Sequence, residues 1–149
     1  MPDWISHLLI GYIAINLMGI KNRKVVYIGT LLPDVFKIYT PISQIFGIES
    51  ELILNFFAPP HTVFGVLLTG LFISSFFGEW RRAYALVLLG AFSHLAADSL
   101  LYPWGSDMWS LYPLWIGDLG TGIFWSGSPL PLGILLPMSS IFYLRNNNR

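Results

Sequence analysis

The stretch AYALVLLGAFSHLAADSLLY, residues 83–102, sets the expectation for the whole fold. It runs for twenty residues, and its only acidic or basic side chains are His94 and Asp98. A helix that crosses a bilayer needs about 20 predominantly apolar residues. Ionisable side chains inside such a helix are costly and usually mark function. The stretch is therefore typical of a membrane-spanning helix that carries functional groups.

Similar runs occur on both sides of this stretch. Residues 4–20, 62–78 and 129–144 are almost free of charged side chains, and a shorter run, 25–39, contains Asp34 and Lys37. If every run spans, the three basic clusters between and after the runs fall on one side of the membrane. The positive-inside rule assigns that side to the cytoplasm. These clusters are Lys21, Arg23 and Lys24; Arg81 and Arg82; and Arg145 and Arg149.

The sequence thus predicts an all-α fold, an integral membrane helical bundle with about five transmembrane helices. Residues 1–149 form a single domain in the cell membrane, with the N-terminus outside and the C-terminus cytoplasmic. The run at 25–39 is short, so a re-entrant segment is the alternative there. Between the runs, Phe46–Phe57 fits a helix lying at the membrane interface, and the Trp-rich segment Trp104–Ser128 fits the headgroup belt.

Composition supports an apolar environment and excludes several classes of protein. Hydrophobic residues make up 54% of the 149 residues, and charged residues make up 11%, against roughly 25% in soluble domains. The net charge is zero, so no nucleic-acid partner is expected. The absence of cysteine excludes disulfides and thiolate metal ligands. A bundle of buried helices in a soluble oligomer is the alternative, and an oligomer remains possible in either case.

Five histidine and aspartate side chains in or beside the apolar runs are candidates for a functional site. Counted at ~1.5 Å per helical residue, they lie about 15 to 27 Å from the basic clusters, in the outer half of a ~30 Å core. Convergence at one depth is what a single polar site requires. The set contains all three histidines of the chain and two aspartates: His7, Asp34, His61, His94 and Asp98.

The chemistry of this set favours a divalent metal. His94 and Asp98 are spaced i, i+4 and so share one helix face. Imidazole together with carboxylate suits Zn²⁺, Mn²⁺ or Fe²⁺. A buried ionised carboxylate is costly without a compensating cation. Taken singly, each side chain also has a structural interpretation, such as a hydrogen bond between helices for His7 or a cap beside Pro33 for Asp34.

At these positions the chain resembles the membrane-bound, metal-dependent hydrolases, a family that includes the LexA-regulated inner-membrane group. More distantly, it is similar to zinc-dependent phospholipase C. The resemblance covers residues 2 to about 113 and depends on the order of several short strings. These are Pro2-Asp3-Trp4-Ile5-Ser6-His7, Gly29-Thr30-Leu31-Leu32-Pro33-Asp34, His61-Thr62, Ser93-His94-Leu95-Ala96-Ala97-Asp98, Trp104-Gly105 and Leu111-Tyr112-Pro113.

The resemblance implies that His7, Asp34, His61, His94 and Asp98 bind metal. One segment departs from the family pattern. Many relatives carry a His-Arg pair before the position of His61, where this chain has Phe57-Ala58-Pro59-Pro60. The departure puts a two-metal site in doubt and removes a candidate phosphate-binding arginine.

The predicted function is a membrane-embedded, metal-dependent hydrolase, with zinc as the first choice of metal and manganese or iron as alternatives. The three histidines and one of Asp34 and Asp98 would bind the ion, and the other carboxylate would orient or deprotonate the attacking water. The expected substrate is a phosphoester of a membrane lipid. Two alternatives stay open: an ion or metal transporter, and a non-catalytic protein with a structural metal.

Overall fold

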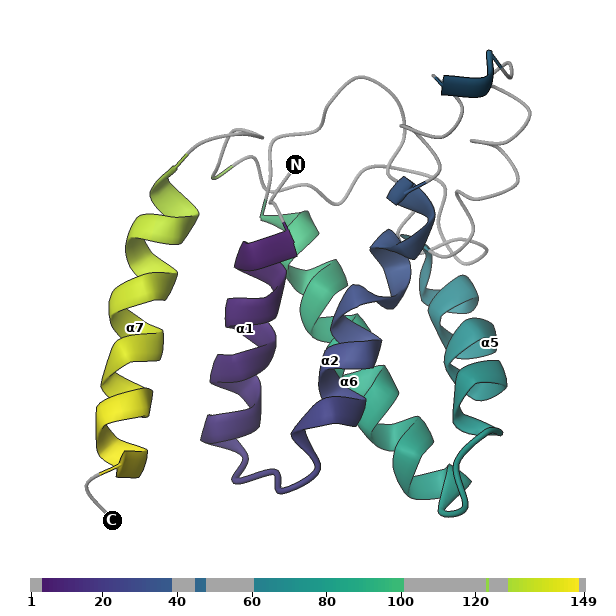
Figure 1. Cartoon of the computed structure of the whole chain (residues 1–149), viewed down its shortest axis with the longest axis horizontal. Helices are drawn as coiled ribbons and strands as arrows, with labels where there is room; N and C mark the ends of the chain where they lie inside the picture. Colours follow the sequence, from purple (N-terminus) through teal and green to yellow (C-terminus); the bar gives the residue numbers. More distant parts are fainter. Residues whose placement is uncertain (1–3, 39–44, 48–60, 101–122, 124–128, 148–149) are drawn as a thin grey trace.

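The regular structure in the described part of the chain is entirely helical (Figure 1). The computed structural model describes residues 4–38, 45–47, 61–100, 123 and 129–147. The predicted all-α class is therefore confirmed for these residues. The elements are α1 (Trp4–Leu17), α2 (Arg23–Leu31), the 3-10 helix η1 (Leu32–Ile38), α5 (Val63–Ser74), α6 (Trp80–Ser99) and α7 (Leu130–Asn147).

Helix α6 is the centre of the bundle. It packs against α1, α2 and α5, while α7 lies beside α1 (Figure 1). Its buried residues recur at the spacing of a helix face and form a single stripe along it. The stripe is apolar over its first three turns and becomes ionisable at its C-terminal end: Ala83, Val87, Gly90, Ala91, His94, Leu95, Ala97 and Asp98. The helix that builds the core thus also carries two candidate site residues.

Two small clusters of apolar side chains hold α6 to its neighbours. Val25 of α2 and Leu32 of η1 pack with Ala83 and Val87 in the N-terminal half of α6. Farther along, Val66 of α5 packs with Ala91 and Leu95. The second cluster ends one turn or less from His94, so the apolar core directly supports the polar end of the helix.

Glycines allow α2 and α6 to approach each other at backbone distance. A Cβ atom added to Gly29 would collide with the backbone of Val87, and one added to Gly90 would collide with the carbonyl oxygen of Val26. The Gly90 Cβ would also lie 2.6 Å from the backbone nitrogen of Thr30. The contact places the C-terminal end of α2 directly against the turn of α6 that precedes His94.

The prediction of a bundle of about five transmembrane helices is wrong. In the residues that the structure describes, no helix combines the length and the apolar character needed to cross a membrane. The same finding overturns the predicted multi-pass location in the cell membrane, with its outside N-terminus and cytoplasmic C-terminus.

The reason is that the helices end inside the apolar runs. Helix α1 has 14 residues and α5 has 12, or about 21 and 18 Å at 1.5 Å per residue. A hydrocarbon core is about 30 Å thick. The run at 25–39 is divided between α2 and η1 at Leu32, directly before Pro33, whose ring removes a backbone donor.

The two longer helices reach their length by including polar residues. Helix α6 has 20 residues, but it begins with Arg81 and Arg82 in its first turn. Helix α7 has 18 residues and includes Arg145 and two asparagines at its end. Apart from residues 46–47 and Ile123, the predicted interfacial helix Phe46–Phe57 and the Trp-rich segment Trp104–Ser128 lie outside the described residues.

Candidate metal centre

The five candidate side chains come from the start of α1, from η1, from the residue before the cap of α5 and from the C-terminal half of α6, and these segments lie at one end of the bundle (Figure 1). His7 comes from the second turn of α1, and Asp34 comes from η1. His61 stands directly before Thr62, whose side chain caps α5 by accepting a hydrogen bond from the backbone of Gly65 at 2.9 Å. His94 and Asp98 occupy successive turns of α6. Four segments that are distant in sequence thus contribute to one place.

Short contacts link the five side chains into one cluster. His61 Nε2 lies 3.0 Å from Asp34 Oδ1, and His94 Nε2 lies 3.5 Å from the same oxygen. His94 Nε2 also lies 3.1 Å from Asp98 Oδ2, while His7 Nε2 lies 3.5 Å from Asp98 Oδ1. Ligand atoms bound tetrahedrally at about 2.0–2.1 Å from one zinc ion are about 3.3 Å apart. The cluster therefore has the spacing of a coordination sphere.

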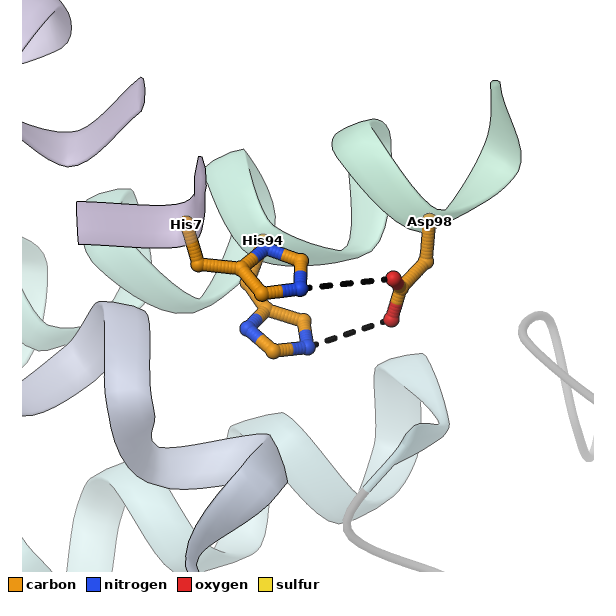
Figure 2. Close-up of side chains that lie close together, drawn as sticks. All are labelled: His7, His94 and Asp98. Carbon is orange, nitrogen blue, oxygen red and sulfur yellow. Dashed lines mark ion pairs between the residues drawn. The ribbon is translucent and has the colours of Figure 1, made fainter. Parts of the chain in front are cut away.

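The His7 and His94 rings are stacked, as Figure 2 shows. Their centroids are 3.7 Å apart and their planes differ by 9°. The Nε2 atoms of the two rings point the same way, and each faces a different oxygen of Asp98 (Figure 2). Both imidazoles thus approach the Asp98 carboxylate from the same side, one toward each oxygen.

The cluster is buried except at His61. The side chains of His7 and His94 are 0% exposed, those of Asp34 and Asp98 are 1% and 6% exposed, and that of His61 is 28% exposed. Two carboxylates with neutral histidines carry two negative charges in a buried place, which is unfavourable unless cations or protons compensate. A divalent cation has the matching charge, and His61 marks the side from which solvent reaches the cluster.

A backbone carbonyl orients His94. Its Nδ1 atom lies 2.7 Å from the carbonyl oxygen of Thr30, which can only accept, so Nδ1 carries the hydrogen. In the neutral ring the lone pair is then on Nε2, which faces the two carboxylates. Metal-binding histidines usually have this arrangement, with the other nitrogen donating to a fixed acceptor.

The sequence around Pro33 explains why this carbonyl is available. In a continuing α-helix, the Thr30 carbonyl would accept from the backbone of Asp34. The chain instead turns into the 3-10 helix η1 at Leu32, next to Pro33. One local change of helix type therefore supplies both the Asp34 carboxylate and the acceptor that orients His94.

The surroundings of His94 determine its protonation. Burial disfavours the charged ring and lowers its pKa, but hydrogen bonding and charge at Asp34 and Asp98 outweigh burial and raise the pKa from 6.5 to about 9. Because the Nε2 lone pair of His94 points at two carboxylates, the arrangement is stable only with a positive charge between them. In the metal-free protein a proton supplies it, and a bound cation would replace that proton.

We expect the stability of the metal-free protein to fall as the pH rises between 6.5 and about 9. The folded state holds the His94 proton more tightly than the unfolded state, so its stabilisation is complete below 6.5 and is lost above the folded pKa. With saturating Zn²⁺ this fall should disappear, because the zinc-bound His94 ring carries no proton that could be lost as the pH rises. Urea denaturation across this range, with chelator or zinc and with His94→Gln as the control, measures both trends. Stability of the chelated protein that is constant or rises with pH would contradict the prediction.

Two overlapping groups of side chains in the described part of the chain could hold a metal ion. One contains His7, His94 and Asp98, and the other contains Asp34, His61 and His94. In each group the ligand atoms lie within 4.8 Å of one another. Every predicted site residue belongs to at least one group, and His94 belongs to both.

Sequence reasoning missed the residues that support this cluster. Thr30 acts through its backbone, which no side-chain pattern indicates. Gly29 and Gly90 allow Thr30 to lie against α6. In the sequence, this close approach was indicated only by Gly90, a glycine one turn before the candidate ligand His94.

Comparisons with known proteins add no family assignment. No family model matches the chain, and neither a curated protein nor a solved structure has significant similarity to it. The resemblance to metal-dependent hydrolases therefore stays a prediction from the short strings of sequence.

Proposed function

We propose that this protein is a metal-dependent hydrolase of phosphoesters and that zinc is its metal. The observation that carries the proposal is the environment of His94. Its oriented Nε2 lone pair faces Asp34 and Asp98 in a buried cluster that a divalent ion would neutralise. Histidine with carboxylate is a ligand set that suits zinc, with manganese or iron as alternatives. The residues that would hold the ion belong to the two groups that share His94.

The chemistry requires an ion, a base and access for the substrate. When bound, a divalent cation would act as a Lewis acid and make water nucleophilic near neutral pH. The carboxylate of Asp34 or Asp98 that does not bind the ion would take the proton from the attacking water. His61, the partly exposed member of the cluster, lies where a substrate would enter.

Exposed apolar side chains that are close in sequence to the cluster residues support a substrate with acyl chains. Trp4 and Ile5 are 44% and 59% exposed next to His7, Val35 is 45% exposed beside Asp34, and Phe64 is 49% exposed one turn after His61. Exposed apolar side chains near a polar site are typical of surfaces that bind apolar ligands. A lipid phosphoester is accordingly the substrate class that we propose.

Hydrolysis assays test this function. We expect the purified protein to hydrolyse phosphatidylcholine dispersed in detergent at least about tenfold more efficiently than glycerophosphocholine, which has the same phosphodiester without acyl chains, since burial of about two CH₂ groups is worth that factor. A chelator should abolish both activities, and zinc should restore them. Phosphate or alcohol release measures the rates.

The outcomes separate the competing functions. Zinc binding without hydrolysis of either substrate would favour a structural metal and contradict the hydrolase. Equal efficiency on both substrates would remove the lipid and leave the phosphoesterase. Activity that resists the chelator would contradict metal dependence.

A further inference from the structure

His94 limits how many ions the cluster can bind. Both groups of candidate ligands use this residue. Its Nδ1 atom is committed to the Thr30 carbonyl, so only Nε2 can bind a metal. A single lone pair binds one ion, so the two groups cannot both be filled. The question is then which group holds the ion.

The orientation of the rings decides against the group that contains His7. The distances between the ligand atoms of this group are compatible with one bound ion. However, an imidazole nitrogen offers its lone pair in the plane of its ring. The His7 and His94 planes are parallel within 9° and the rings are stacked at 3.7 Å. An ion in the plane of His94 would therefore lie a full stacking distance from the plane of His7. That separation exceeds a zinc–nitrogen bond of about 2.0–2.1 Å.

The other group has converging side chains. The His61 and His94 rings meet at 64° with their centroids 5.8 Å apart. Their Nε2 atoms lie 3.0 and 3.5 Å from the same oxygen of Asp34. The Nε2 edges of the His61 and His94 rings and one Asp34 oxygen thus surround one point. His61 is also the partly exposed member, which gives this point the solvent access that catalytic sites need and structural sites lack.

We infer that the cluster binds one ion through Asp34, His61 and His94, and that His7 is a positioning residue outside the coordination sphere. His7 contacts both site residues of α6: its ring covers the face of His94, and its Nε2 faces Asp98 Oδ1. These contacts fix the plane of His94 and the direction of Asp98. This inference rests on the proposed metal site and assigns its ligands.

Matched phenylalanine variants test the assignment. His7→Phe keeps an aromatic ring on His94 but removes both nitrogens, and His61→Phe makes the same change at a proposed ligand. We expect His7→Phe and the conservative His7→Gln to weaken zinc binding by no more than about 10–100-fold, as loss of an outer contact does. His61→Phe should weaken it by more than about 100-fold. Competition with a chromogenic chelator measures the affinities, and the Co²⁺ absorption spectrum should be unchanged in the His7 variants. A loss of more than about 100-fold in His7→Gln with an altered Co²⁺ spectrum would overturn the inference.

A measurement on the unaltered protein avoids any effect of substitution on folding. With ¹⁵N-labelled histidine, added Zn²⁺ should shift the Nε2 resonances of His61 and His94 to coordinated values and leave the nitrogens of His7 at uncoordinated values. A coordinated shift at His7 would overturn the ligand assignment while leaving the proposed function intact. No coordinated shift at any histidine would overturn both.

Discussion

Replacing His94 with alanine is expected to abolish zinc binding and to reduce hydrolysis to the level of the metal-free protein. His94 is common to both groups that could hold an ion, so its loss leaves neither complete. Structural zinc sites bind with about 10–16 kcal/mol in total, so one ligand carries about 3 kcal/mol, or more than about 100-fold in the dissociation constant. Zinc content after purification and competition with a chelator measure the loss.

Ser93→Ala provides the control for this substitution. Ser93 lies on the same turn of α6, and its hydroxyl donates to the carbonyl oxygen of Gly90 at 2.7 Å without reaching the cluster. Zinc binding should stay within about twofold of the original value, because an interaction outside the site is removed. Circular dichroism establishes that both variants are folded. Zinc retained by a folded His94→Ala protein would contradict the metal site.

The positions of the helices could be predicted from the sequence, but their lengths could not. Each apolar run contains a helix, yet α1 stops at Leu17, before Gly19 turns the chain with a φ of 64°. Helix α5 stops at Ser74 within an equally apolar run. Hydropathy averages over such stops, because a glycine or serine changes the mean little while it ends a helix. Because the helices were predicted to be as long as the apolar runs, they were wrongly predicted to span a membrane.

The gathering of the five side chains could be predicted because burial of a carboxylate needs a partner. Asp34 and Asp98 are both buried, and each is faced by two histidines. The spacing of His94 and Asp98 placed them on one helix face, as the structure shows. The stack of His7 on His94 could not be predicted, because it depends on the angle between α1 and α6. The role of Thr30 depends on backbone geometry, which residue types alone do not specify.

Replacing Gly90 with alanine is expected to lower the free energy of unfolding by about 2 kcal/mol, because overpacking of a tight interior costs up to about 3 kcal/mol. The new methyl group would collide with the Val26 carbonyl and lie 2.6 Å from the Thr30 nitrogen, so α2 must move away from α6. This cost opposes the gain of about 1 kcal/mol that alanine brings to a helix interior. Urea denaturation measures the difference.

Gly133→Ala in α7 measures the stability that alanine adds to a helix without any steric clash, since a Cβ atom there meets nothing within 4 Å. That variant should be as stable as the original protein or more stable by up to about 1 kcal/mol. In Gly90→Ala the displaced Thr30 carbonyl should also release His94 Nδ1, weakening zinc binding by about 10–100-fold. Stability equal to that of Gly133→Ala would show that α2 and α6 are not in backbone contact. Lost stability with unchanged zinc affinity would show instead that the Thr30 carbonyl does not hold His94 in place, because the same helix movement must lengthen that hydrogen bond.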